Sequence, residues 1–325
     1  MSTLPTTFPE TIPDKLNWLK DRYWKFGQDF ELAGHLEGLF EPDEDGQMTA
    51  QPCIDPLTGE AKGVMLIAGS EWGKTALIRR ALRSSRVLTE HHVDQPGNTL
   101  LVTAPPTATL KKLAEMILEQ TGYAKVDSRM RGADAWELVI HRLGLIGIKL
   151  VIIDECHHLL TSGPGKDVPS AIQSLKHIMQ SKSGVALMIA GVPALRDAIK
   201  SEPTRETYRR FTECTFSPIL LRTQMARDFN ANFSRCAQVM GVSVPEEDMF
   251  VERILFASDG HIGTSVVIAK AILRDAVIKR RDTLSLHQAE QVYRKLKKKA
   301  TGETPFKQNE WSVVEKELTV LGWAA

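Results

Sequence analysis

The residues best suited to do chemistry lie at positions 68–75, whose sequence is AGSEWGKT. An apolar run precedes this segment, and a helix-forming stretch follows it. A glycine-rich turn between a strand and a helix directs backbone N–H groups at phosphate oxygens, and the positive end of the helix adds attraction. The Lys74 ammonium would reach the β- and γ-phosphates, and the Thr75 hydroxyl would hold Mg²⁺. The predicted phosphate-binding residues are Gly69, Ser70, Glu71, Trp72, Gly73, Lys74, Thr75 and Ala76.

This segment departs from the usual G-x-x-x-x-G-K-[ST] pattern at its start. Ala68 stands at the first position, Gly69 comes one place late, and the bulky Trp72 directly precedes Gly73. The alternative is a chance G-K-T turn in an unrelated fold. A strand before the turn, a helix after it and a second motif downstream argue against that alternative.

The second motif is KLVIIDECHHLL at residues 149–160, where an apolar run ends in two carboxylates. Asp154 at the strand tip would coordinate Mg²⁺ through water, and Glu155 would orient and polarise the attacking water. Phosphoryl transfer depends mainly on positioning and charge neutralisation, so two carboxylates and one lysine suffice. A strand that merely ends in an acidic turn is the alternative. The position about 80 residues after the lysine, in the expected strand–helix alternation, favours the catalytic interpretation.

Cys156, His157 and His158 follow these carboxylates and suggest a metal site. Adjacent side chains diverge on a helix, however, and no other ligand cluster lies nearby in the sequence. We therefore expect the two histidines to pack and form hydrogen bonds behind the active site.

Two adjacent arginines, Arg209 and Arg210, end a predicted helix in the segment ETYRRFTECTF at residues 206–216. An arginine that one subunit projects into the nucleotide site of its neighbour accelerates phosphoryl transfer by several orders of magnitude. A pair of solvated surface arginines is the alternative, and the spacing alone does not decide between them.

The elements around these motifs form an alternating pattern. Near-continuous apolar runs alternate with amphipathic helical segments, which predicts an α/β fold whose parallel sheet is covered by helices on both faces. The expected strands are residues 64–69, 99–104, 149–154, 185–191 and, more weakly, 214–221.

The remainder of the chain reads as helical. An amphipathic stretch runs from Leu16 to about Leu39, and only helical patterns follow Leu221. We therefore expect an N-terminal helical extension at 1–45, an α/β core at 46–221, a helical domain at 222–300 and a tail at 301–325. The tail would either dock onto a partner or pack on its own helical domain.

Composition excludes several classes of protein. The 325 residues carry 41 Lys and Arg against 40 Asp and Glu. This balance excludes a protein whose whole surface is basic and coats nucleic acid, but it does not exclude a local basic patch. No apolar run reaches the roughly 20 residues of a membrane helix. The N-terminal residues do not read as a secretory signal. Four scattered cysteines, Cys53, Cys156, Cys214 and Cys236, suit reduced thiols and argue against a disulfide framework or a zinc knuckle. A cytoplasmic protein is expected.

Taken together, AGSEWGKT, VIIDECHHLL, VALMIAGVPAL, YRRF before a strand and SDGHIGTSVVIAKAI resemble the AAA+ ATPases of transposition. The chain is most similar to the TniB/TnsC group, with MuB as a more distant relative, over about residues 45–280. The resemblance implies an AAA+ core with a helical lid, ATP and Mg²⁺ as cofactors, and ATP hydrolysis. It assigns Lys74 and Thr75 to nucleotide and Mg²⁺, Asp154 and Glu155 to Mg²⁺ and hydrolysis, and Arg209 or Arg210 to the trans-acting finger.

Two further family positions differ in this chain. The strand end at Ala190, Gly191 and Val192 takes the first sensor place, where a polar side chain is usual. Thr264 and Ser265 stand in the second sensor segment, where many AAA+ proteins have an arginine.

The resemblance also implies DNA binding. Such proteins form ATP-dependent helical filaments on duplex DNA and touch its backbone, and hydroxyls and lysines suit contacts that read no sequence. The candidates are Thr103, Thr107, Thr109, Lys111, Lys112, Arg129 and Arg131. An ordinary helix N-terminus, with Thr109 as cap and both lysines solvated, is the alternative.

The expected function is an ATP-dependent regulator of transposition that oligomerises on duplex target DNA as a hexameric turn or filament. It would recruit and activate a DDE transposase, with a TniQ-like targeting adaptor as a further partner, and ATP hydrolysis would control disassembly. The alternatives are an AAA+ ATPase of another class, such as a replication initiator or helicase loader, and a nucleotide-binding switch with little hydrolysis.

Overall fold

The computed structural model describes residues 9–106, 109–123, 126–127, 129–160, 168–180, 184–297, 304–307 and 310–320. The chain divides into two compact units. The first unit comprises Met1–Gln28, Glu71–Gly73 and Ser217–Ala325, and the second comprises Asp29–Ser70 and Lys74–Phe216. Each unit is described on its own.

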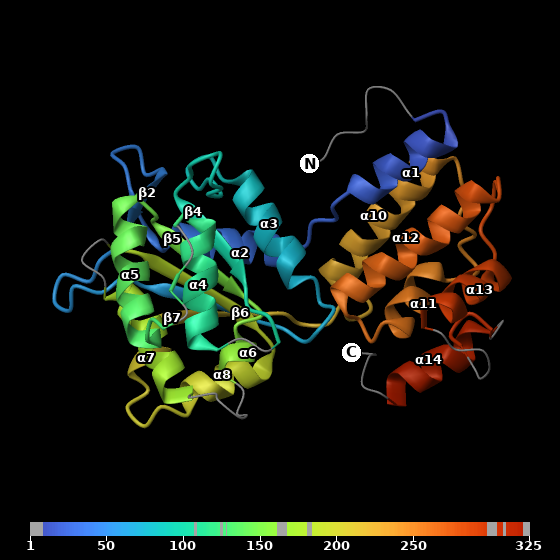
Figure 1. Ribbon diagram of the computed structural model, residues 1–325. Coiled ribbons are helices and arrows are strands. Elements are labelled where there is room, and N and C mark those ends of the chain that lie inside the picture. Colours follow the sequence, from blue (N-terminus) through green and yellow to red (C-terminus); the bar gives the residue numbers. More distant parts are fainter. Residues whose placement is uncertain are drawn as a thin grey trace. The chain divides into compact units, whose positions relative to one another are not determined.

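A five-stranded parallel sheet is the centre of the second unit (Figure 1). The strands are β3 (Gly63–Ile67), β4 (Thr99–Thr103), β5 (Leu150–Asp154), β6 (Ala186–Gly191) and β7 (Phe211–Thr215). Their order across the sheet is β4-β5-β6-β3-β7. Every residue of β3, β5 and β6 is buried, as expected for parallel strands that are covered on both faces. The predicted α/β class and the first four strands are confirmed.

The fifth strand was predicted in the wrong place. The sequence suggested residues 214–221, whereas β7 spans Phe211–Thr215 and pairs only with β3. An edge strand exposes part of its surface, and in β7 only Phe211 and Cys214 are buried. A search for continuous apolar runs therefore misses it.

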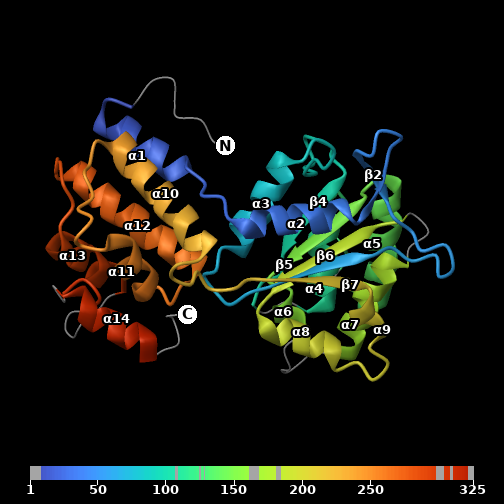
Figure 2. The same cartoon turned by 180° about the vertical axis from the view of Figure 1, so that it is seen from behind.

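Helices cover both faces of this sheet (Figures 1 and 2). Leucines of α2 (Gly27–Glu37) and apolar residues of α3 (Lys74–Ser84) form one core with Val64 and Leu66 of β3. The other core, on Met65 and Ile67, takes in α4 (Leu110–Gln120), α5 (Gly132–Leu145), α6 (His157–Leu160), α7 (Val168–Met179) and α8 (Pro193–Lys200). The short helix α9 (Glu206–Arg209) precedes β7, and a hairpin of β1 (Phe40–Pro42) and β2 (Met48–Pro52) follows α2.

The amphipathic stretch near the N-terminus is two helices rather than one. Helix α1 (Ile12–Asp21) ends at an extended Arg22, and α2 begins at Gly27. Trp24 and Phe26 lie between them with their rings 5.0 and 6.4 Å from that of Phe229. Packing of these aromatic rings holds the connecting residues out of a helix. α1 belongs to the first unit, and most of α2 belongs to the second.

Among its described residues, the first unit is built from helices. Besides α1 it contains α10 (Gln224–Met240), α11 (Phe250–Ala257), α12 (Ile262–Ile278), α13 (Leu286–Lys297) and α14 (Trp311–Val320). The helical character predicted after Leu221 is confirmed among the described residues, and α14, in the predicted tail, was not foreseen. Val314 of α14 is buried, so the tail packs on its own unit. None of the described helices combines the length and apolar character that a membrane span requires.

Candidate nucleotide-binding site

The loop between β3 and α3 turns sharply just before the helix begins. Glu71 and Gly73 both have left-handed backbones, with φ of 65° and 91°. The value at Gly73 is one that L side chains rarely adopt, which explains the glycine directly before the lysine. Helix α3 begins at Lys74, as predicted, so its free N–H groups face the place where phosphate would bind.

The bulky Trp72 is accommodated by contacts with a distant segment of the first unit. Its ring lies 4.5 Å from the ring of His261. A side chain at Gly263 would bring its Cβ within 2.1 Å of the Glu71 carbonyl oxygen, so only glycine fits there. Sequence reasoning missed both His261 and Gly263, since nothing in the loop indicates partners 190 residues away.

Lys74 is buried, with 4% of its surface exposed, and its ammonium donates to the carbonyl oxygens of Ala68 at 3.1 Å and Gly69 at 2.9 Å. Burial lowers the pKa of Lys74, although the negative charges of Glu155 and Asp154 act in the opposite direction. A cation held by two loop carbonyls in a partly dehydrated site can exchange these weak acceptors for phosphate oxygens.

Thr75 and Asp154 join the helix to the sheet at this point. The Thr75 hydroxyl donates to Oδ2 of Asp154 at 2.5 Å, and Oδ1 of Asp154 accepts the backbone N–H of Glu155 at 2.9 Å. Asp154 is almost fully buried. A hydroxyl and a carboxylate are oxygen ligands of the type that Mg²⁺ prefers, so this pair fits the ion assigned to it from the sequence.

Glu155 leaves the strand tip with a left-handed backbone, φ 54°, and its carboxylate lies 3.3 Å from Nδ1 of His157. The rings of His157 and His158 lie 4.1 Å apart, so the expectation that adjacent side chains diverge is wrong here. Neighbouring Cβ atoms are close enough for two imidazoles that turn toward each other to touch. Burial and the neighbouring His158 lower the pKa of His157, which favours its neutral form.

The comparisons with known proteins show the family and the fold of this chain. A model of the family of bacterial TniB proteins matches residues 54–219, just over half of the chain. The chain belongs to the TniB family. No curated protein sequence matches it.

Solved structures similar to this TniB-family chain show its fold. The ORC1 protein of Aeropyrum pernix in complex with DNA has 17% identity over 87% of this chain and 68% of that one, with a TM-score of 0.59. The ORC2 protein of the same organism, in ADPNP–ADP complexes, has 15% identity over 89% and 70%, with a TM-score of 0.52. The Walker-type ATPase paby2304 of Pyrococcus abyssi has 14% identity over 93% and 76%, with a TM-score of 0.52. The fold is that of the AAA+ ATPases, as predicted.

The two arginines of the TniB-family chain have different surroundings. Arg210 is half-buried and donates to the carboxylates of Glu60 at 2.7 Å and Glu206 at 3.0 Å. Glu206 also pairs with Lys176. Arg209, the last residue of α9, is exposed, and no ion pair joins it to another of the described residues. The alternative of two equivalent solvated arginines does not hold, because the partners of Arg210 lie in its own chain.

The DNA candidates lie near the N-terminal ends of α4 and α5. The Thr109 hydroxyl accepts the N–H of Lys112 at 3.2 Å and caps α4, as the simpler alternative proposed. Lys112 pairs with Glu115 at 3.5 Å, Lys111 lies beside Gly132, and Arg131 makes two hydrogen bonds to Asp134. Thr103 and Arg129 are exposed, while Thr107 lies outside the described residues.

The two segments that the resemblance matches to the AAA+ sensors carry no charged group at Gly191, Thr264 or Ser265. A Cβ at Gly191 would meet the Leu195 side chain at 2.9 Å, so a larger residue at the end of β6 would require that side chain to shift. The Ser265 hydroxyl is fully buried and bonds to His261 and Ser258, and Thr264 is also buried. Neither hydroxyl replaces an arginine.

Proposed function

We propose that this TniB-family protein binds ATP with Mg²⁺ and hydrolyses it. The observation that carries the proposal is the direct hydrogen bond from Thr75 to Asp154, which joins a hydroxyl and a carboxylate. The buried Lys74 ammonium, which is influenced by the charge of Asp154, supplies the cation of a phosphate site. Bound Mg²⁺ would supply charge neutralisation between the phosphates. The backbone of Gly69, Ser70, Glu71, Trp72, Gly73 and Ala76 would cradle them.

Within this scheme Glu155 orients and polarises the attacking water, and Arg209 acts on the nucleotide of a neighbouring subunit. Arg209 is preferred over Arg210 because its guanidinium has no carboxylate partner among the described residues. The boundaries at 45/46, 221/222 and 300/301, with residues 46–221 as core and 222–300 as lid, are part of the same proposal.

We further propose that the protein assembles on duplex DNA as a filament or hexameric turn in the bacterial cytoplasm. Family membership supports this proposal, as does the DNA in the complex of the similar Aeropyrum pernix ORC1 protein. Lys111, Lys112, Arg129 and the exposed Thr103 would contact phosphates without reading bases. The assembly would recruit and activate a DDE transposase, with a TniQ-like adaptor choosing the target, and ATP hydrolysis would release it.

A second candidate function is a nucleotide switch with little hydrolysis. It is favoured by the absence of charge at the sensor positions, Gly191, Thr264 and Ser265, and by the position of Glu155 against His157. Glu155→Gln separates the two proposals, because it keeps the shape of the side chain and loses its charge. If the protein is an ATPase, phosphate release should fall by about 100-fold or more. If it is a switch, the already slow release should not change.

Electron microscopy of the protein with duplex DNA, with and without a non-hydrolysable ATP analogue, tests the assembly. We expect ordered filaments or rings on unrelated DNA sequences with the analogue, and none without it. Lys74→Ala serves as the matched control, because it should lose assembly while it keeps its fold. Filaments of Lys74→Ala that form equally well without nucleotide would overturn the proposed link between ATP and assembly.

A further inference from the structure

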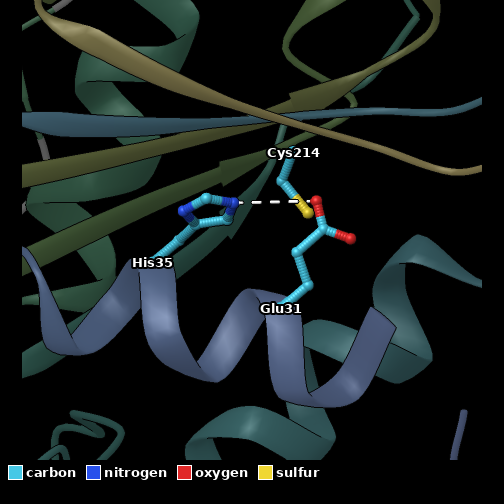
Figure 3. A group of neighbouring side chains, drawn as sticks. All are labelled: Glu31, His35 and Cys214. Atoms are coloured by element: carbon cyan, nitrogen blue, oxygen red, sulfur yellow. Dashed lines mark ion pairs between the residues drawn. The ribbon is translucent and has the colours of Figure 1, made fainter. Parts of the chain in front are cut away.

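Three metal-binding side chains of different types meet between α2 and β7 (Figure 3). Glu31 and His35 project from α2 toward the sheet, and Cys214 projects from β7 toward α2. One ligand atom from each lies within 4.8 Å of both others. We propose that Glu31, His35 and Cys214 form a binding site for a divalent zinc ion.

The local structure positions this set firmly. Glu31 and His35 are four residues apart on one helix, so their side chains lie one above the other on the same face, and Nε2 of His35 is 3.7 Å from Oε1 of Glu31. Cys214 is fixed opposite Leu66 of β3 in the sheet. Leu32 and Leu36 of the same helix are buried in the core that includes Cys214, so α2 cannot slide away from the strand without exposing them.

The donors match zinc better than magnesium. A thiolate sulfur and an imidazole nitrogen suit zinc, whereas Mg²⁺ prefers an octahedron of oxygen atoms. In a tetrahedral site, zinc bonds of about 2.0–2.3 Å separate neighbouring ligand atoms by about 3.3–3.6 Å. Here the imidazole nitrogen and the carboxylate oxygen are 3.7 Å apart, and no pair of ligand atoms is more than 4.8 Å apart. Glu31 and His35 retain 46% and 27% of their side-chain exposure, so both can turn inward.

Solvent access is one-sided at this cluster. Cys214 is fully buried, while the carboxylate and the imidazole reach the surface, so an ion can enter from the α2 side and keep a water as fourth ligand. Burial and the adjacent Glu31 carboxylate raise the pKa of the Cys214 thiol to about 12. Zinc must displace that proton, so its binding releases protons and weakens as the pH falls.

The cluster takes no part in the proposed nucleotide chemistry. Its link to the rest of the molecule runs through β7, which begins two residues after Arg209 and contains Cys214. Zinc would join α2 to this edge strand, whose only strand neighbour among the described residues is β3. The proposal therefore stands whether or not the chain hydrolyses ATP.

The test uses the full-length, reduced protein with Zn²⁺ and with Co²⁺ as a spectroscopic probe. We expect about one tightly held zinc per chain by equilibrium dialysis, and a thiolate-to-cobalt charge-transfer absorption that zinc abolishes. His35→Gln and Cys214→Ser should each weaken zinc binding by more than the roughly 10–100-fold typical of outer-shell changes. Because Cys214 is buried, Cys214→Ser can disturb folding as well as zinc binding. His35 is part-exposed, so His35→Gln tests the site without that complication.

Matched controls separate this site from others. Cys53→Ser and His141→Gln change a cysteine and a histidine elsewhere and should leave zinc affinity unchanged. His157→Gln tests the other group of close ligand atoms, Glu155, His157 and His158. Zinc binding that resists His35→Gln but is lost in His157→Gln would overturn the proposal. The proposal would also be overturned if the protein retained no zinc, or if it bound cobalt without a charge-transfer band. Either result would mean that the three side chains form a hydrogen-bonded cluster and not a metal site.

Discussion

Two buried cations, one in each unit of the chain, have different surroundings. Lys74 in the second unit donates to two consecutive carbonyls of its own loop and is influenced by the carboxylates of Asp154 and Glu155. Arg253 in the first unit donates to the carbonyls of Asp248 and Pro305, and its guanidinium lies 5.8 Å from the Trp311 ring centroid. Burial lowers the pKa of both groups.

The difference teaches that burial of a charge does not by itself identify a binding site. The partners of Lys74 lie next to each other in one loop, so an incoming phosphate can replace them together. The partners of Arg253 lie 5 and 52 residues away along the chain, so the arginine joins α11 to the segment before α14. Lys74 is held by two consecutive carbonyls of one loop, whereas Arg253 joins segments that lie apart in its own chain.

The largest expected effect is on ATP affinity. Lys74→Ala should abolish detectable ATP binding, a loss of at least about 100-fold, because the backbone N–H groups only partly offset the phosphate charge. The free energy of unfolding should change little, since the lost hydrogen bonds are to loop carbonyls. Isothermal titration calorimetry and urea unfolding measure the two quantities. Unchanged ATP affinity in the folded variant would rule out the phosphate-loop assignment.

Arg209 and Arg210 differ in the same way as Lys74 and Arg253 do. Arg209→Ala should reduce ATP hydrolysis by about 10³-fold with stability unchanged, because its contact is to a neighbouring subunit. Arg210→Ala should instead lower the free energy of unfolding by about 1–3 kcal/mol, because it leaves Glu60 without its closest cation. Phosphate release against protein concentration and chemical unfolding check both variants.

A mixing experiment sharpens this prediction. Some subunit interfaces between Arg209→Ala and Lys74→Ala chains would join an intact ATP site to an intact finger. Activity should therefore return on mixing. A mixture no more active than its components, although the two variants demonstrably co-assemble, would make Arg209 a local surface residue.

Arg253 should affect stability alone. Arg253→Met keeps most of the side-chain volume but leaves the Asp248 and Pro305 carbonyls without this donor. We expect a loss of about 2–4 kcal/mol in the free energy of unfolding, with ATP affinity unchanged. Thermal unfolding monitored by circular dichroism, together with ATP titration, measures both. A marked fall in ATP affinity of the folded variant would contradict the division between the two cations.

Sequence reasoning predicted the parts of the molecule whose chemistry is local. Two such predictions are confirmed: the order of strand, loop and helix around Lys74, and the strand that ends in the carboxylate of Asp154. Both depend on residues that are neighbours in the sequence. The edge strand β7 was misplaced, because only Phe211 and Cys214 of its residues are buried and it forms no continuous apolar run.

The rest depended on contacts between residues far apart in the chain. Glu60 holds Arg210 across 150 residues, and His261 packs on Trp72 across a still longer separation. The scattered cysteines gave no sign that Cys214 would meet Glu31 and His35, because that meeting requires α2 to pack on the face of the sheet toward which Cys214 projects. A single sequence carries no local signal for such pairs.

The smallest expected effect concerns DNA. Lys112 is exposed and pairs with Glu115, and Lys111 is partly exposed, so any phosphate contact of the two would lie at the surface. Lys111→Ala combined with Lys112→Ala should lower affinity for duplex DNA by about tenfold, equally for unrelated sequences. The slope of log affinity against log salt should become shallower by about 2, since each lost phosphate contact accounts for about 0.9. Fluorescence anisotropy at several salt concentrations measures both.

Arg131→Ala is the matched control for this pair, because its guanidinium is already held by Asp134 through two hydrogen bonds. It should change DNA affinity less than the lysines do. Circular dichroism should show α4 intact in the double variant, since the Thr109 cap accepts a backbone N–H that the substitution keeps. A loss confined to one DNA sequence would indicate base reading. If DNA affinity did not fall at all, both lysines would interact only within their own chain, as Arg253 does. The exposed Arg129 would then be the next residue to test.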